Sequence, residues 1–392
     1  MFSRKIFPIL IEALTKKQII AITGLRRVGK TTTVKFLFNE IKSSNKFYFD
    51  LERLEYRKLF SGDHYENIVN ALRLEGADFS KKLFLALDEI QLVPNITSVI
   101  KYIYDTYDVK FIVTGSSSFY MKEQFSESLA GRKQLFELWP LSFDEFLEFK
   151  NAGVNLPEFS FQNSNEYFID KLSLLYDEYN QFGGFPEVAL ISKPEDKKSL
   201  LQDILESYVN FDIRFLSDFT KSDEIHSVIK MLASRVGSKV DYSKLSSLIG
   251  INRHKVKEYI LFLENTYFIK LLKPFVTNPD REITLQKKLY FTDSGLLNLL
   301  GQISSGSLFE NTIANQLFTK STLQYFAKKN GKEIDFILNE NRAFEVKETP
   351  TPHDLKILKN RATSIGINEY HLIGKTAPGS NFKDFIWGGA IY

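Results

Sequence analysis

The stretch IIAITGLRRVGKTT, residues Ile19 to Thr32, decides the fold of the amino-terminal region. An apolar run of strand length (19–23) leads directly into a segment that fits G-x-x-x-x-G-K-[ST], and a helical pattern follows. Gly24 and Gly29 allow the loop to curl, so that successive backbone N–H groups point inward at an anion. The helix that begins near Lys30 adds its positive end. The sequence therefore predicts a phosphate-binding loop between a buried strand and a helix.

The loop supplies the expected contacts to ATP. Lys30 is expected to reach the β- and γ-phosphates, and Thr31 to place its hydroxyl on Mg²⁺. The alternative is a chance glycine turn with an exposed lysine, which the strand before the motif and the helix after it disfavour. The residues expected to bind the nucleotide here are Gly24, Leu25, Arg26, Arg27, Val28, Gly29, Lys30, Thr31 and Thr32.

Further apolar runs of strand length follow at 47–50, 83–87 and 111–115, with 133–138 as a possible fifth. Helical patterns separate them. This alternation predicts an α/β fold with a mostly parallel sheet that is covered on both faces.

Acidic and hydroxyl side chains follow two of these runs. LFLALDEIQ delivers Asp88 and Glu89 to the edge of the sheet where phosphates would lie. Asp88 is expected to support Mg²⁺, and Glu89 to polarise an attacking water. In FIVTGSSS, Thr114 or Ser116 is expected to sense the γ-phosphate, although serines after a strand are also ordinary turn formers. Arg132 is a candidate cation for the transferring phosphate, in its own site or a neighbour's, which would imply an oligomer.

Composition narrows the class of protein. The 392 residues are 43% hydrophobic and 25% charged, which is typical of a globular chain of two or three domains. Cysteine is absent, and this excludes disulfides, zinc–thiolate sites and cysteine nucleophiles. The net charge of +3 does not by itself indicate a nucleic-acid partner. No run approaches the roughly 20 apolar residues of a membrane helix, and no secretory signal is evident, so we expect a soluble, cytoplasmic protein.

The rest of the chain divides by composition into three further segments. After the predicted nucleotide domain (1–150), helical patterns predict a lid or linker (151–215), in which Gly183, Gly184 and Pro186 mark a sharp turn. A mainly helical segment (216–300) and a final segment with strand-like runs (301–392) follow.

A short helix, a turn and a longer helix are predicted in DYSKLSSLIGINRHKVKEYILFLENTYFI, residues 241–269. Leu245 and Leu248 lie before the turn at Gly250, and residues 256, 260 and 263 are expected to face inward. FIKLLKPF and KKLYFTDSGL would form the hairpin of a winged helix. The longer helix would meet DNA through the basic residues at its start. The alternative is a module that only packs domains together. These basic residues are Arg253, His254, Lys255 and Lys257.

The final segment contains GKEIDFILNENRAFEVKE, residues 331–348. Alternation places Glu345 and Lys347 on one face of a strand, and a tight hairpin brings Asp335 alongside. The carboxylates would hold Mg²⁺, with Glu310 on the preceding helix as a further ligand, while Lys347 orients a water for phosphodiester attack. The pattern resembles the D…E-x-K signature of the restriction-endonuclease-like fold, but alternation of this kind is also typical of an exposed strand.

Taken together, GLRRVGKTT, LALDEIQ, TGSSS, the AGR that precedes LWPLSFDEF, and GGFPEV resemble the AAA-type family often called archaeal ATPases. The likeness covers nearly the whole chain. It implies a P-loop NTPase fold with an extra strand, so that 111–115 lies between 19–23 and 83–87. It also implies a carboxy-terminal domain of unassigned function. The family's nucleotide residues correspond to Gly24, Gly29, Lys30, Thr31, Asp88 and Glu89.

The leading hypothesis is a Mg²⁺-dependent ATPase whose nucleotide state controls a winged-helix and nuclease-like module acting on DNA. Two alternatives remain. One is an ATP-dependent regulatory switch that acts on a protein partner, with an inactive nuclease-like site. The other is a DNA-binding regulator without catalysis at either site.

Overall fold

The computed structural model describes residues 2–62, 64–115, 129–154, 166–213, 222–276, 286–328, 331–376 and 382–391. The chain forms two compact units. The amino-terminal unit comprises residues 1–139, 210–218 and 265–267, and the carboxy-terminal unit comprises 140–209, 219–264 and 268–392. Among the described residues, no helix has the length and apolar character needed to span a bilayer.

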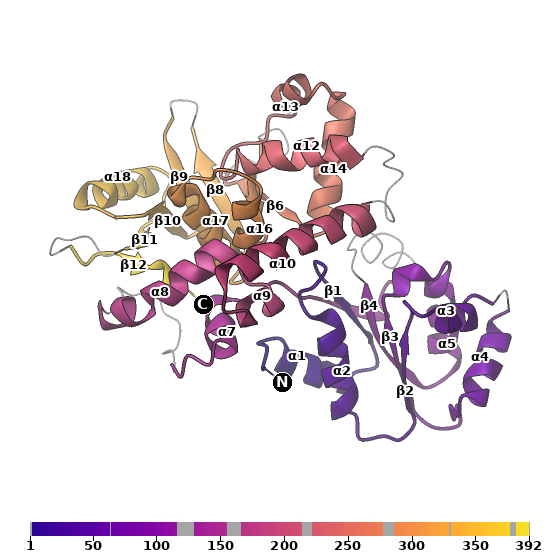
Figure 1. The fold of residues 1–392 in the computed structure, drawn as a ribbon. Coiled ribbons are helices and arrows are strands. Elements are labelled where there is room, and N and C mark those ends of the chain that lie inside the picture. Colours follow the sequence, from indigo (N-terminus) through magenta and orange to yellow (C-terminus); the bar gives the residue numbers. More distant parts are fainter. Residues whose placement is uncertain are drawn as a thin grey trace. The chain divides into compact units, whose positions relative to one another are not determined.

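The amino-terminal unit contains a five-stranded parallel sheet with the order β2-β3-β4-β1-β5 (Figure 1). The expected α/β class is confirmed, and so is the fifth strand. The strand after the acidic pair, β4, lies between β1 and β3, as the family resemblance implied. The strands are β1 (Ile19–Thr23), β2 (Lys46–Asp50), β3 (Leu83–Asp88), β4 (Val109–Gly115) and β5 (Lys133–Glu137).

Helices cover this sheet because its central strands are apolar on both faces. Every residue of β1 and β4 is buried. Alternate residues of β3 and β4 form one apolar cluster with the buried faces of α4 and α5, and α2 packs on the sheet with Val34 and Leu37 buried. The elements are α1 (Phe7–Thr15), α2 (Lys30–Glu40), α3 (Leu54–Phe60), α4 (Tyr65–Leu74), the short 3-10 helix η1 (Ile90–Leu92) and α5 (Ile96–Thr106).

The carboxy-terminal unit is built on a seven-stranded sheet with the order β12-β11-β10-β9-β8-β6-β7 (Figure 1). The antiparallel pair β6–β7, which follows the predicted helix-turn-helix, belongs to the same sheet as the strands of the final segment. The strands are β6 (Ile269–Pro274), β7 (Lys288–Phe291), β8 (Leu323–Ala327), β9 (Glu333–Leu338), β10 (Arg342–Lys347), β11 (Glu369–Gly374) and β12 (Ile386–Trp387). The three boundaries between the four segments drawn from composition remain predictions.

The described helices of this unit precede, separate and cover those strands. They are α7 (Phe143–Phe149), α8 (Glu166–Phe182), α9 (Pro186–Leu190), α10 (Pro194–Ser207), α12 (Ser222–Ala233), α13 (Tyr242–Ile249), α14 (Arg253–Asn265), α16 (Ser294–Leu299), α17 (Ser305–Phe318), α18 (Pro352–Thr363) and η4 (Gly388–Ala390). The π-helical turn η3 (Tyr208–Ile213) follows α10, and its residues 210–213 belong to the amino-terminal unit.

The helix pair α13–α14 forms where the sequence predicts it. Asp241 caps α13 by accepting hydrogen bonds from the backbone N–H groups of residues 243 and 244, and Gly250 ends it with a left-handed φ of 74°. Residues 256, 260 and 263 of α14 are buried, as expected. Leu248, by contrast, is 53% exposed. The helices and the β6–β7 hairpin occur in the expected order, and their assignment as a winged helix stays a prediction.

Candidate functional site

The loop between β1 and α2 depends on its glycines. Gly24 has a φ of 149°, and a Cβ at this position would stand 2.1 Å from the carbonyl oxygen of Leu138. Gly29 is left-handed, with a φ of 97°, and immediately precedes the first residue of α2. The curled turn predicted by the motif is therefore present, and only glycine fits at position 24.

The side chain of Lys30 lies inside this turn. Lys30 is 4% exposed, and its Nζ donates hydrogen bonds to the carbonyl oxygens of Gly24 and Leu25, each at 3.1 Å. Thr31 is half-buried in the first turn of α2, and Thr32 is exposed. The loop thus carries one fixed ammonium group beside the start of a helix, an arrangement suited to an anion.

A second cation, Arg4, holds the loop from outside. The Arg4 side chain is buried, its Nη1 donates to the carbonyl oxygen of Val28 at 3.1 Å, and its Nη2 donates to that of Trp139 at 2.8 Å. The guanidinium therefore fixes the loop relative to the segment after β5. Sequence reasoning missed this residue because nothing in the local pattern connects position 4 with positions 28 and 139.

Asp88 and Glu89 lie at the carboxyl end of β3, next to the end of β4, and Thr114 connects them. The Thr114 hydroxyl donates to Oδ1 of Asp88 and accepts a hydrogen bond of 2.9 Å from the backbone N–H of Glu89. Asp88 is 2% exposed, and its Oδ2 accepts a bond of 2.8 Å from the Tyr48 hydroxyl. Thr114 therefore orients the Asp88 carboxylate and holds the backbone at Glu89, whose carboxylate accepts a hydrogen bond from Gln91. Tyr48 is a second residue that the sequence did not reveal.

The electrostatics of this edge favour a cation beside the acidic pair. Burial and the neighbouring carboxylate of Asp88 raise the pKa of Tyr48. Burial, followed by repulsion from Glu89 and Asp50, raises the pKa of Glu52. Several carboxylates therefore share one partly desolvated region, and a divalent cation bound there would relieve their repulsion.

The loop residues and the acidic pair fit a nucleotide and Mg²⁺. The glycine cradle and the Lys30 ammonium are groups of the kind that bind phosphate, and Thr31 and Asp88 carry oxygen atoms, the ligands that Mg²⁺ prefers. β1, β3 and β4 are parallel, so their carboxyl ends meet at one edge of the sheet. Ser116 lies outside the described residues.

Arg132 lies at the other end of the sheet from the glycine loop. It precedes β5, whose first residue, Lys133, pairs with Ile19 at the amino end of β1, whereas the loop follows the carboxyl end. At about 3.3 Å per residue, the length of β1 separates the two by roughly 16 Å, which is beyond the reach of an arginine side chain. Arg132 is bound to Asp105 of its own chain through two hydrogen bonds of 2.8 and 3.0 Å.

The predicted hairpin in the final segment brings its charged residues together. β9 and β10 are antiparallel, with Phe344 opposite Phe336, and Oδ2 of Asp335 accepts a bond of 2.9 Å from the backbone N–H of Val346. Glu345 is 8% exposed. Its Oε1 accepts from Lys347 at 2.9 Å, and its Oε2 is buried without a hydrogen-bond partner among the described residues.

Lys288 of β7 enters the same centre and was not foreseen. Its side chain is 3% exposed, its Nζ forms an ion pair with Glu333, and it lies 4.0 Å from Oδ1 of Asp335. Burial lowers the pKa of Lys288, but the carboxylates of Asp335, Glu310 and Glu333 outweigh this effect, and the pKa is raised. The ammonium group therefore remains charged among these carboxylates.

The other two carboxyl groups of this centre are also engaged. Glu310 accepts a hydrogen bond of 2.8 Å from the Tyr290 hydroxyl, and Glu345 has the guanidinium of Arg361 at 3.4 Å in addition to Lys347. Burial is the main cause that raises the pKa of Glu310 to about 7, and the same holds for Glu345, also to about 7. Both carboxyl groups therefore hold a proton more readily than exposed ones do.

As these side chains stand, they do not fit a divalent metal ion. Within the described ranges, no group of three or more His, Cys, Asp or Glu side chains is placed to hold one. Lys288 already supplies positive charge beside Asp335. The ligand set expected from sequence (Glu310, Asp335, Glu345) is assembled in one region without that geometry, and it stays a prediction.

The basic residues at the start of α14 are mostly accessible. Arg253, His254 and Lys257 are exposed, whereas Lys255 forms an ion pair of 3.3 Å with Glu224. Three of the four residues expected to meet DNA therefore face solvent.

Comparison with known proteins gives matches along the chain. A family model described as an AAA domain matches residues 16–147, and two families described as domains of unknown function match 173–307 and 305–385. An uncharacterized protein of Haemophilus influenzae is 27% identical over 331 residues, which cover 81% of this chain and 78% of that protein. One of Methanocaldococcus jannaschii is 26% identical over 378 residues, covering 92% and 82%.

Solved structures show a more distant likeness. The Walker-type ATPase of Pyrococcus abyssi is 14% identical with a TM-score of 0.47, over 76% of this chain and 96% of that one. The Orc1 protein of Aeropyrum pernix, solved in complex with DNA, is 13% identical with a TM-score of 0.35, over 76% and 92%. The likeness of the amino-terminal unit to P-loop proteins therefore rests on the family model and on the geometry of the glycine loop. Residues 16–147 match the family model of an AAA domain, and the amino-terminal unit has the parallel α/β sheet and the glycine loop of a P-loop NTPase fold.

Proposed function

We propose that the chain is a Mg²⁺-dependent ATPase. The observation that carries the proposal is the Thr114 hydroxyl, which joins Asp88 and Glu89 at the same sheet edge as the glycine loop. Thr31 and Asp88 would hold Mg²⁺, and the bound ion would neutralise negative charge on the phosphates. Lys30 binds the phosphates, and Glu89 polarises the attacking water.

The test measures ATP binding and turnover by the full chain in two variants, each with one substitution in the amino-terminal unit. Lys30→Ala removes the ammonium group in the loop and should abolish ATP binding. Glu89→Gln keeps the shape and removes the base, so ATP should still bind while turnover falls at least a hundredfold. Undiminished turnover in either variant would exclude the assignment.

The second part of the proposal is that the nucleotide state controls DNA contact by α14. The exposed basic residues at its start, Arg253, His254 and Lys257, support this assignment. The triple alanine variant should weaken DNA binding about tenfold or more and reduce the dependence of binding on salt. Lys255→Ala is the matched control, because Lys255 is paired with Glu224. DNA affinity unchanged in the triple variant would favour a module that only packs domains together.

Two roles remain for the carboxylate centre. A nuclease is favoured by the adjacency of Asp335, Glu345 and Lys347, and by the unpartnered Oε2 of Glu345. An inert centre, within a switch that acts on a protein partner, is favoured by the Lys288 ammonium beside Asp335. These two roles are separated by ATPase and nuclease assays on one preparation, with Mg²⁺ or Mn²⁺. The double variant Asp335→Ala/Lys347→Ala is the control. Cleavage that persists in the control variant would come from a contaminant.

A further inference from the structure

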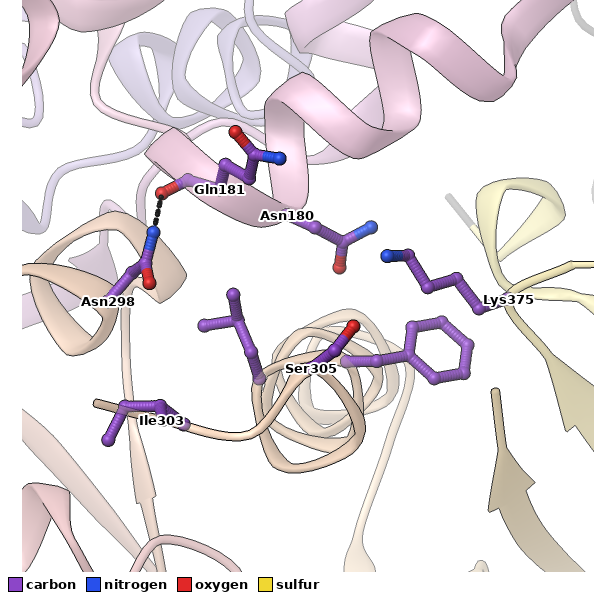
Figure 2. Close-up of a pocket in the computed structure, with 8 residues that line it drawn as sticks. Asn180, Gln181, Asn298, Ile303, Ser305 and Lys375 are labelled. Atoms are coloured by element: carbon purple, nitrogen blue, oxygen red, sulfur yellow. Dashed lines mark hydrogen bonds between the residues drawn. The ribbon is translucent and has the colours of Figure 1, made fainter. Parts of the chain in front are cut away.

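The carboxy-terminal unit contains a cavity of about 300 Å³ that the ATPase proposal does not use (Figure 2). It lies between the end of α8, the first turns of α17 and Lys375, which follows β11. Asn180 and Gln181 contribute polar groups, while Leu308 and Phe309 contribute apolar surface. The cavity therefore offers both a polar end and an apolar wall.

The amide of Asn180 lacks a partner on one side. Asn180 is 2% exposed, and its Nδ2 donates a bond of 2.9 Å to the carbonyl oxygen of Tyr176. This bond fixes which end of the amide is nitrogen, since an oxygen there would face another oxygen. Its Oδ1 is buried with no hydrogen-bond partner among the described residues, and Figure 2 shows the amide facing the cavity on the side of Lys375. A buried acceptor of this kind calls for a hydrogen-bond donor, which a ligand in the cavity would supply in place of water.

The first turn of α17 and the neighbouring Lys375 favour an anion in the cavity. α17 has 14 residues and begins at Ser305, so the backbone N–H groups of its first turn have no acceptor within the helix. Ser304 caps only the N–H of Ser307, at 3.1 Å. The ammonium group of Lys375 adds a full positive charge, and its backbone is fixed by a bond of 3.0 Å from Trp387 Nε1.

Two carboxylates reduce the positive potential that the start of α17 and the Lys375 ammonium create in the cavity. Asp177 lies 3.2 Å from the Lys375 ammonium, and Glu348 lies 3.7 Å from the position that a Cβ of Gly306 would occupy. The site therefore selects a ligand by hydrogen bonding as well as by charge.

We propose that this cavity binds a small phosphorylated metabolite. The phosphate lies against Lys375 and the first turn of α17, a hydroxyl of the ligand donates to Oδ1 of Asn180, and the organic part packs on Phe309. Inorganic phosphate shares the anionic end and, as monohydrogen phosphate, also carries an O–H donor. Sulfate has similar shape and charge but no proton to donate at neutral pH. The preference for phosphate over sulfate, compared between the wild-type residue and Asn180→Leu, therefore reports on Asn180.

The test measures binding by titration calorimetry with three probes: inorganic phosphate, sulfate and ribose 5-phosphate. All proteins carry Lys30→Ala, so that the loop at 24–31 does not bind the probes and failure of the ATPase proposal leaves this test intact. We expect phosphate to bind about tenfold more tightly than sulfate, and ribose 5-phosphate more tightly still. A preference for phosphate without a gain for ribose 5-phosphate would assign the site to free phosphate instead.

Two variants and a control complete the experiment. Asn180→Leu should abolish the preference for phosphate over sulfate, and Lys375→Met should weaken both about tenfold. Lys383→Met, at an exposed lysine, should change neither. Because Lys375 is partly exposed, its variant tests the site even if Asn180→Leu fails to fold. Equal affinity for phosphate and sulfate, or undiminished binding in Lys375→Met, would overturn the proposal.

Discussion

At the scale of single residues, each of the two candidate centres contains charged side chains that are buried. Lys30 and Asp88 are almost completely buried in the amino-terminal unit, and Lys288 is equally buried in the carboxy-terminal one. A buried charge is costly unless it is paired or hydrogen-bonded, and each of these has such partners. Their partners therefore matter as much as the residues themselves.

Gly24→Ala should destroy the nucleotide site. The added Cβ would overlap the backbone carbonyl of Leu138, at 2.1 Å, and the φ of 149° disfavours any other residue. We expect a loss of ATP binding and a fall in the free energy of unfolding of about 2 kcal/mol or more. Urea denaturation and ATP titration measure the two effects.

The matched control is Gly301→Ala, where a Cβ meets nothing within 4 Å. It should change the free energy of unfolding by no more than about 0.5 kcal/mol. ATP binding retained in Gly24→Ala would show that the loop is less constrained than this close contact requires.

Lys288→Met should destabilise the protein strongly. It leaves the carboxylates of Glu333 and Asp335 without their buried cation. Breaking a buried ion pair from one side costs about 3–5 kcal/mol, which urea denaturation would measure.

Lys356→Met, at an exposed lysine of α18, is the control and should have little effect. Adding Glu333→Gln and Asp335→Asn to Lys288→Met should recover part of the loss, because no unpaired charge remains at those positions. A triple variant no more stable than Lys288→Met would contradict the ion-pair explanation.

At the scale of elements, the turn after α8 is held by Asp293, a residue distant in the sequence. Gly183 and Gly184, recognised in the sequence as a sharp turn, lie against Asp293, which caps α16. Oδ2 of Asp293 accepts a bond of 2.8 Å from the N–H of Gly184, and Oδ1 accepts one of 3.0 Å from that of Leu296. One carboxylate therefore joins two elements that are 109 residues apart.

Asp293→Asn should alter the pH dependence of stability. Burial raises the pKa of Asp293 to about 6, above its usual value of about 3.9. The folded state therefore binds the proton more tightly, and this contribution is complete below about pH 4 and lost as the pH rises through 6. From pH 4 to 7 the wild type should lose about 2–3 kcal/mol relative to Asp293→Asn, measured by urea denaturation.

Asp203→Asn, at an exposed carboxylate of α10, serves as the control and should follow the wild-type curve. Parallel curves for the wild type and Asp293→Asn would show that Asp293 titrates alike in the folded and unfolded states.

Arg132 bears on the assembly of the whole molecule. Its position at the opposite edge of the sheet from the glycine loop leaves it no role in its own nucleotide site. If it stabilises the transferring phosphate of a neighbouring copy, wild-type turnover per chain should rise with protein concentration, and turnover of Arg132→Ala should not. A loss of turnover in Arg132→Ala under conditions where the chain is monomeric would contradict action in trans. Arg132 and its Asp105 partner are both partly exposed, so little change in stability is expected.

Local pattern predicted much of the fold. The expected strands 19–23, 47–50, 83–87 and 111–115 differ from the observed ones by at most two residues at either end, because an apolar run bounded by turn residues has few alternatives in a parallel sheet. The glycine loop and the β9–β10 hairpin were foreseen for the same reason. The membership of β6 and β7 in the carboxy-terminal sheet was not, since sheet order depends on packing rather than on sequence neighbours.

By itself, the sequence determined the curled loop, the acidic pair at the end of β3 and the basic start of α14, because each is encoded within about a dozen consecutive residues. Only the tertiary structure decided that Arg4 holds the loop, that Tyr48 and Thr114 orient Asp88, and that Lys288 lies among the carboxylates. Such partners are separated by 24 to 47 residues, and only the packing of the folded sheet brings a buried charge and its counter-charge together.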